Sequence, residues 1–279
     1  MKPIEYTEWD GSVPAIVLNM PNEAYHNHDS ISNSGLSLVS RSPAHYAFRT
    51  PWATTRAMDM GTAFHTALLE PERFKAEYVV TEVNDRRVVG YKDAAKVYGG
   101  DKTLTANEGA SVSVMSESIR SNEAAHTLLS SPGYAEVSFF VKDPETGCVL
   151  RCRFDWLTHT GFAIDLKKTQ DCREFAFSKS VLNYRYHCQA AMYSHVYELV
   201  MGKPLESFKF LAVEEQPPCA NVLYDLDAFA MQIGHTGYRE SLAEYAKANE
   251  SGVWTTYTGT GVVTLPEWAL LNAEEGVVI

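Results

Sequence analysis

Two neighbouring segments in the middle of the chain alternate apolar and polar residues, which is the pattern of half-buried strands. We expect the strands over Val149–Thr158 and Phe162–Lys168, and the connection Thr158–Gly161 contains a glycine suited to a tight turn. The pattern predicts two antiparallel strands joined as a hairpin. If Thr158 pairs with Phe162, the register of the other residues follows, although a bulge at Gly161 would shift that register by one.

The polar faces of these two strands bring charged residues together. On the first strand we expect Arg151, Arg153 and Asp155 to share one face, opposite an apolar face formed by Cys148, Leu150, Cys152, Phe154 and Trp156. On the second strand, Asp165 and Lys167 share the polar face. The hairpin register then places Asp155 opposite Asp165.

Two opposed carboxylates are unfavourable without a counter-charge. Their Cβ atoms would be about 5 Å apart, and at an effective dielectric of about 20 the carboxylates would repel by roughly 3 kcal/mol. A hard divalent cation such as Mg²⁺ would remove this repulsion, since it prefers carboxylate oxygens. With Lys167 on the same face, the set is suited to phosphodiester hydrolysis. The alternative, from spacing alone, is a solvated face with a cross-strand salt bridge.

The net charge is −11 at pH 7, which by itself argues against binding to the phosphates of nucleic acids. Basic residues are concentrated between Cys148 and Cys188, however, so a locally basic cleft in an acidic exterior is compatible with DNA. No segment approaches the roughly 20 apolar residues that span a bilayer, and we expect neither a membrane partner nor a secretory signal. The five cysteines include no CxxC pair, so we expect no iron–sulfur cluster and a cytoplasmic protein with reduced thiols.

The order of the expected elements indicates one α/β domain over residues 1–279. We divide it into an irregular lead-in (1–30), a core (31–215), and a C-terminal strand, helix and aromatic tail (216–279) that contains Trp254, Tyr257 and Trp268.

Within the core, helices precede a block of three strands, and one long helix over Ser180–Met201 precedes two more. A strand is also expected at Ala15–Leu18 in the lead-in. This order predicts a sheet flanked by helices.

Other residues outside the hairpin have side chains that a metal site could use. His65 lies on an expected helix near the core boundary, where its ring needs a partner, although a lone helical histidine is more often a surface or core residue. Glu136 starts the strand that precedes Asp155 and matters only if that strand borders the metal. Gln189 and Tyr193 are four residues apart and share a helix face, as in any amphipathic helix.

Two further sets have both a structural and a functional interpretation. Tyr184 and Tyr186 are either stacking residues or part of the core. Ser32 and Ser34 are expected as helix caps, with phosphate contact as the alternative.

Taken in order, these motifs resemble the PD-(D/E)xK nuclease superfamily and, within its RecB-like branch, the RecE-like nuclease domain of exodeoxyribonuclease VIII. The residues that carry the resemblance are Ser32–Leu38, Ser42-Pro43, Gly61-x-x-x-His65, Glu136, Arg153-x-Asp155, Asp165-x-Lys167 and Gln189-x-x-x-Tyr193. They span most of residues 25–215. Each motif is weak alone, but together they form an ordered set on the expected helices and strands. The resemblance implies a PD-(D/E)xK core, a central mixed sheet flanked by helices.

The resemblance also implies a metal site. His65, Asp155 and Asp165 would coordinate Mg²⁺, for which Mn²⁺ would substitute, with help from the backbone carbonyl of Leu166. Lys167 would orient or activate the attacking water and stabilise charge at the phosphate.

The remaining matched residues would support the metal and the DNA. Glu136 would act in catalysis by holding a metal-bound water or a second metal. Gln189 and Tyr193 would brace the site and contact the strand being cut. Further candidates for DNA binding are Ser34, Arg41 and Arg185.

The activity implied by the resemblance is 5′-to-3′ exonucleolytic degradation of double-stranded DNA from its ends. The 3′ single strand left behind would be loaded with a single-strand annealing protein of RecT type for recombination, and the enzyme would form a homo-oligomeric ring, a tetramer in such enzymes. The alternatives are a PD-(D/E)xK nuclease of other polarity or endonucleolytic action, and a non-catalytic DNA-binding relative. Arg153 and Ser42 depart from the glycine and cysteine of many RecB-like proteins, which also argues against an iron–sulfur variant.

Overall fold

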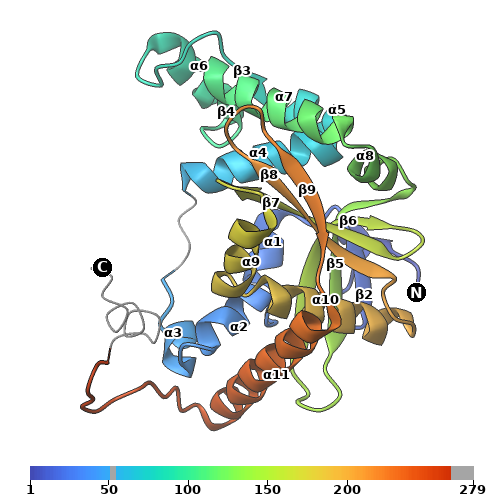
Figure 1. Ribbon diagram of the computed structural model, residues 1–279, viewed down its shortest axis with the longest axis vertical. Helices are drawn as coiled ribbons and strands as arrows, with labels where there is room; N and C mark the ends of the chain where they lie inside the picture. Colours follow the sequence, from blue (N-terminus) through green and yellow to red (C-terminus); the bar gives the residue numbers. More distant parts are fainter. Residues whose placement is uncertain (51–54, 265–279) are drawn as a thin grey trace, which may run out of the picture.

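The structure is a computed structural model that describes residues 1–50 and 55–264. Its centre is a seven-stranded sheet in the order β1-β2-β5-β6-β7-β8-β9 (Figure 1). The strands are β1 (Ile4–Glu5), β2 (Ala15–Leu18), β5 (Gly133–Lys142), β6 (Val149–Thr158), β7 (Phe162–Thr169), β8 (Ser207–Glu214) and β9 (Asn221–Asp225). The pairs β1–β2 and β7–β8 are parallel and the other neighbours are antiparallel, so the predicted mixed sheet is confirmed.

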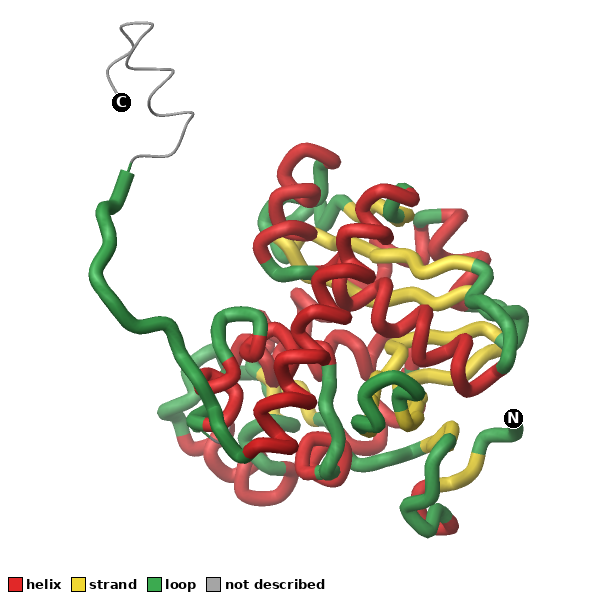
Figure 2. The backbone as a smooth tube through the Cα atoms, turned by 90° about the horizontal axis from the view of Figure 1, so that it is seen from below, coloured by secondary structure: helices red, strands yellow, loops and turns green. Residues whose placement is uncertain are grey.

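Helices cover both faces of this sheet (Figures 1 and 2). On one face, α10 (Tyr186–Met201) contacts β5 and β6 and packs against α11 (Ala228–Ser251) and α2 (Asn33–Val39). On the other face, α4 (Arg56–Leu69), α7 (Ala106–Ser121) and α8 (Glu123–Leu129) contact β6 or β8. The remaining elements are η1 (Tyr6–Glu8), α1 (Asn22–Asn27), α3 (Pro43–Ala47), α5 (Pro71–Glu77), α6 (Val89–Tyr98), α9 (Glu174–Asn183) and a small sheet of β3 (Val79–Val80) with β4 (Thr103–Leu104).

The alternation along β8 explains why the sheet has a core on each side. Phe208, Phe210 and Ala212 belong to the cluster beneath α10, whereas Leu211 and Val213 belong to the cluster beneath α4 and α7. A strand that is apolar on both faces is expected where helices cover both sides of a sheet.

The hairpin of β6 and β7 has the predicted register. Trp156 pairs with Ile164 and Leu157 with Ala163, which is the alignment set by Thr158 opposite Phe162. Gly161 has a φ of 94° and its N–H donates to the Thr158 carbonyl, so the turn uses the left-handed conformation without shifting the register.

The prediction of one long helix over Ser180–Met201 is wrong, because the structure contains two helices there. α9 ends at Asn183 and α10 begins at Tyr186. Between them, Arg185 has a φ of 56° and a ψ of 37°, a left-handed conformation that interrupts the helix. Its guanidinium donates to the Gly237 carbonyl of α11, and this contact holds the break in place.

α11 is continuous through Gly234 and Gly237. A Cβ atom at Gly234 would clash with the carbonyl oxygen of His187. The glycine therefore allows α11 to approach α10 closely. The helix begins with the Asp227 side chain accepting from the Ala230 N–H, and Gly252 closes it in a left-handed conformation.

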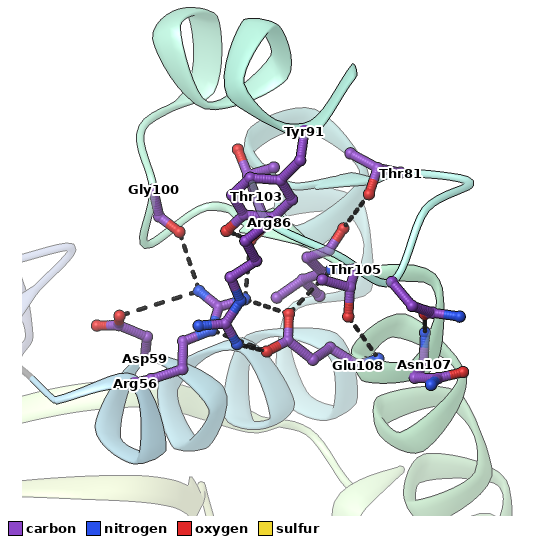
Figure 3. Close-up of polar contacts among 12 residues, drawn as sticks. Arg56, Asp59, Thr81, Arg86, Tyr91, Gly100, Thr103, Thr105, Asn107 and Glu108 are labelled. Atoms are coloured by element: carbon purple, nitrogen blue, oxygen red, sulfur yellow. Dashed lines mark hydrogen bonds and ion pairs between the residues drawn. The ribbon is translucent and has the colours of Figure 1, made fainter. Parts of the chain in front are cut away.

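A network of polar contacts holds α4 against α7 (Figure 3). Glu108 of α7 accepts hydrogen bonds from Arg56 of α4, from Arg86 and from the Thr105 N–H. Arg56 also donates to the carbonyl oxygens of Gly100 and Thr103. Because α4 carries His65, this network positions one component of the site described below.

The segment before residue 31 is attached to the central sheet. β2 lies at the predicted Ala15–Leu18 and pairs with β5. Arg151 of β6 is buried and donates to the carbonyl oxygens of His28, Ser30 and His26. Its neighbour Arg153 donates to other residues of this segment and of β5: Asn22, Met20 and Ser138.

The chain after α11 continues as an irregular segment over residues 252–264, which extends from the body of the molecule (Figure 2). Trp254 packs against Tyr46 and Tyr245, and Tyr257 stacks on His45. Trp268 of the predicted aromatic tail lies outside the described residues. In the described part of the chain, no helix is long and apolar enough to cross a membrane.

Candidate active site

The candidate site lies where the alternation of two strands is interrupted. Phe154 and Leu157 of β6 both face the cluster beneath α10, although strict alternation would put them on opposite faces. Trp156 packs instead on the α4 side, where its indole N–H donates to Leu128. The prediction that Trp156 shares a face with Phe154 is therefore wrong, because the strand twists at Asp155.

β5 is interrupted at the same level. Glu136 has a φ of 47°, in the left-handed region, and it would stand opposite Asp155. Pairing between β5 and β6 runs on both sides of this position, with Ala135 opposite Trp156 and Val137 opposite Phe154. The irregularity turns both carboxylates out of the regular ladder, toward a helical histidine.

That histidine is His65 of α4. Its Nδ1 atom lies 3.5 Å from Oε1 of Glu136 and 3.6 Å from Oδ2 of Asp155. The three side chains offer ligand atoms that all lie within 4.8 Å of one another, and theirs is the one such group of acids, histidines and cysteines in residues 1–50 and 55–264. Glu136 thus belongs to a cluster that could hold a metal ion, the condition that the sequence analysis set for its role.

Asp155 also bonds to the middle of the next strand. Its Oδ2 atom accepts a 2.7 Å hydrogen bond from the Leu166 N–H of β7. The sequence pointed to the Leu166 carbonyl as a metal ligand and missed this use of the N–H. The register contained the signal, since pairing of β7 with β6 ends at Ile164 and leaves later β7 residues without a partner on β6.

The second half of the site is a buried group on β7 and α10. The Lys167 ammonium lies 2.6 Å from Oδ2 of Asp165 and donates to Oε1 of Gln189 at 3.0 Å. The Gln189 amide in turn donates to Oδ1 of Asp165. Gln189 therefore contacts both residues of the predicted Asp-x-Lys motif and holds their relative position.

The electrostatics of the site show an excess of negative charge. Burial raises the pKa of Asp155 to about 7, and the nearby Asp165 carboxylate contributes to the rise. Burial would lower the pKa of His65, but the carboxylates of Asp155 and Glu136 outweigh it and raise the pKa to about 9. The Lys167 pKa is raised as well, because Asp165 outweighs the effect of burial. A carboxyl group that resists ionisation beside cations that retain their protons indicates a place for additional positive charge.

The donor set fits a hard divalent ion. Asp165 Oδ2 is buried and, within the described residues, accepts no hydrogen bond of normal geometry; its charged neighbour is the Lys167 ammonium. Carboxylate oxygens are the ligands that both Mg²⁺ and Mn²⁺ prefer. His65, Glu136 and Asp155 would supply the ligand atoms, with Asp165 at the edge of the group.

The other predicted site residues have diverse environments. Tyr193, one turn after Gln189, packs on Phe154 and Phe208, with a ring centroid 5.3 Å from that of Phe154. Ser34 and Arg41 are exposed, and the Ser34 hydroxyl shares a hydrogen bond with Ser32, the N-cap of α2.

The Arg185 guanidinium contacts α11, as described above. Contact of Tyr193, Ser34, Arg41 and Arg185 with DNA stays a prediction.

The fold and the cluster together define a PD-(D/E)xK-like protein. The family described as "PDDEXK-like domain of unknown function (DUF3799)" matches residues 32–262, and the chain belongs to this family. This membership confirms the recognition of a PD-(D/E)xK core and is consistent with the RecE-like resemblance. A search of curated proteins finds no significant match.

Two solved structures match the chain, and one of them is similar enough to compare folds. A crystal structure from Eubacterium rectale, described as a "putative exonuclease", has a TM-score of 0.61 at 13% identity over 85% of this chain and 88% of that one. The structure of SSO0001 has a TM-score of 0.28 at 10% identity over 74% and 84% of the two chains, too low to carry an argument. The first likeness shows the fold.

Proposed function

We propose that this protein is a nuclease that hydrolyses DNA phosphodiester bonds with the help of Mg²⁺. The observation that carries the proposal is the convergence of His65, Glu136 and Asp155 beside the buried pair of Asp165 and Lys167. These groups come from one helix and three strands, so a chance surface cluster is a poor explanation for them. Membership in the PDDEXK-like family supports the same interpretation.

The residues of the site have separable tasks in this proposal. His65, Glu136, Asp155 and Asp165 would hold the ion, which when bound supplies positive charge to the phosphate and lowers the pKa of a water. Lys167 is protonated, so it binds and orients the phosphate oxygens and offsets the negative charge that develops on them.

The finer proposal is a 5′-to-3′ exonuclease that acts on ends of double-stranded DNA and leaves 3′ single strands for recombination by annealing. It rests on the RecE-like resemblance of the motifs, as do a ring-shaped homo-oligomer and an annealing partner of RecT type. The exonuclease description of the Eubacterium rectale structure supports it further.

The proposal is tested with a linear duplex labelled at either the 5′ or the 3′ end and with a closed circle of the same sequence. We expect Mg²⁺-dependent release of the 5′ label first, no cut in the circle, and no reaction in EDTA. Lys167→Ala should lower the rate by at least about 100-fold, the effect of removing a group that stabilises developing charge. The matched control is Lys209→Ala, whose ammonium pairs with Asp225 of β9 instead.

Each other outcome selects an alternative. Cutting of the circle indicates an endonuclease, and release of the 3′ label first indicates the opposite polarity. Binding without Mg²⁺-dependent turnover indicates a non-catalytic relative. Equal rates for wild type and Lys167→Ala would contradict the assigned role of this lysine.

A further inference from the structure

Three aromatic rings form a stack that runs from the core to the surface beside Lys167. The ring of Phe210, which is fully buried, stacks on Tyr186 with centroids 5.5 Å apart and planes at 27°. Tyr186 stacks in turn on Tyr184, at 5.6 Å and 29°. Tyr184 is 65% exposed, so the stack ends in an aromatic ring that is open to solvent.

The left-handed residue between the two tyrosines creates this arrangement. In a continuous helix, side chains at i and i+2 do not face each other. Here Arg185 breaks the helix between Tyr184, which caps α9, and Tyr186, which starts α10. Left-handed backbone at a non-glycine residue is strained and marks many ligand-binding positions. The strain at Arg185 therefore has a visible result, the pairing of two aromatic rings.

The stack lies next to the proposed chemistry. The Lys167 ammonium is 4.4 Å from the centroid of the Tyr186 ring. Both tyrosines also line a cavity of about 360 Å³, whose other lining residues include Lys168, Thr169 and Ser180. A phosphate held by Lys167 would thus have an aromatic surface within one nucleotide of it.

We propose that Tyr184 is a stacking platform for an unpaired nucleobase of the strand that is cut, next to the scissile phosphate. The inference rests on the proposed function and adds the position of a base to it. Stacking on an aromatic face tolerates any base, because every base has a π-face. The site would therefore favour a frayed or single-stranded end and not a particular sequence.

Another exposed ring on the same helix does not share these properties. Phe175, at the start of α9, is 74% exposed and has the Lys179 ammonium 4.1 Å from its centroid. Its cationic neighbour is this lysine, and Phe175 is not among the residues that line the cavity. Phe175→Ala is therefore the matched control for the loss of an exposed aromatic ring from α9.

The test uses duplex DNA with phosphorothioate linkages at its ends, to slow cleavage, and the fluorescent base 2-aminopurine at the terminal position of one strand. Stacking quenches this fluorophore. We expect quenching by wild type, Tyr184→Phe and Phe175→Ala, but not by Tyr184→Ala. On ordinary DNA, Tyr184→Ala should raise KM by about 5- to 150-fold, the range expected for one lost base stack, with a much smaller change in kcat.

Each result is decisive for one of the two proposals. If wild type cleaves DNA and Tyr184→Ala matches it in quenching and KM, the platform is wrong while the nuclease stands. An equal defect in Phe175→Ala would also overturn the platform, since the effect would then not be specific to Tyr184. If wild type neither cleaves nor binds DNA, the proposed function fails and the platform with it. Thermal unfolding of each variant checks that the fold is retained.

Discussion

At the scale of single residues, the candidate site depends on side chains that form hydrogen bonds to one another. Gln189 accepts from Lys167 and donates to Asp165, so one buried amide sets the separation of the Lys167 ammonium and the Asp165 carboxylate. Sequence reasoning reached Gln189 only through the resemblance to a family. The periodicity of the helix placed it on a shared face with Tyr193, but periodicity does not show which opposing strand a helix covers.

We expect Gln189→Ala to lower kcat by about 10- to 100-fold, as the loss of an orienting partner does at metal sites. Gln189→Glu should be worse, because it adds a carboxylate beside Asp165. Steady-state rates on linear DNA measure both effects. Ser194→Ala is the control on the same helix, since that hydroxyl donates to the Ala190 carbonyl within α10. A Gln189→Ala enzyme as active as wild type would show that Lys167 and Asp165 need no brace.

Glu136 combines a site role with an unfavourable backbone. Its φ of 47° costs a residue with a Cβ atom about 1 kcal/mol more than it costs glycine. Both Glu136→Gly and Glu136→Ala remove the carboxylate, but we expect the glycine variant to be the more stable by about 1 kcal/mol, against the usual preference in strands. Urea unfolding in EDTA measures the difference. The reverse order would mean that the backbone at this position relaxes in solution.

At the scale of secondary-structure elements, the sequence predicted the hairpin that carries the site. β6 has the predicted bounds, and the turn at Gly161 kept the register that sets Asp155 against Asp165. Alternating patterns predict such strands well, because one buried face fixes both type and register. The break at Arg185 was missed, since the residues on both sides are compatible with a helix and the cause is a contact with α11.

The network that joins α4 to α7 gives a prediction for stability and pH. Burial would raise the pKa of Glu108, but its bonds to Arg56 and the Thr105 N–H outweigh this and lower the pKa from 4.5 to about 2. A pKa that is lower in the folded state stabilises it above the unfolded value, and this contribution is lost as the pH falls toward 2. We therefore expect Glu108→Gln to cost about 2 kcal/mol at pH 7 and progressively less below pH 4.5.

Urea unfolding of wild type and Glu108→Gln at several pH values between 7 and 3 measures this difference. Glu117→Gln provides the control, because Glu117 lies on the exposed face of the same helix. A cost for Glu108→Gln that does not change with pH would show that packing, and not the ion pairs, accounts for it.

At the scale of the whole molecule, the N-terminal segment and the central sheet form one folded unit. β1 and β2 extend the sheet at one edge, and β8 and β9 extend it at the other. The sequence predicted β2 but not the buried arginines that attach the segment around it, since polar residues on a strand usually indicate a solvated face. Arg151 is only 7% exposed, yet its partners are backbone carbonyls that no sequence pattern reveals.

Arg151→Ala should destabilise the protein by about 3 kcal/mol, because several carbonyl groups lose a charged donor. The amides of residues 26–31 should then exchange with solvent faster than those of β8, which hydrogen exchange with mass spectrometry resolves. Arg87→Ala is the control, as Arg87 pairs with Asp85 on the surface and is 88% exposed. Uniformly faster exchange over the chain would indicate global destabilisation without a local attachment role.

The short pairing of β6 with β7 has a consequence for how this chain can vary. Two residue pairs, Trp156 with Ile164 and Leu157 with Ala163, fix the alignment of these strands before they diverge at Asp155 and Asp165. A slip of one residue would send Asp165 and Lys167 to the opposite side of the sheet. Relatives that lengthen other loops should therefore conserve the spacing between Thr158 and Phe162, because an insertion there would misalign the two acids even if every functional side chain were preserved.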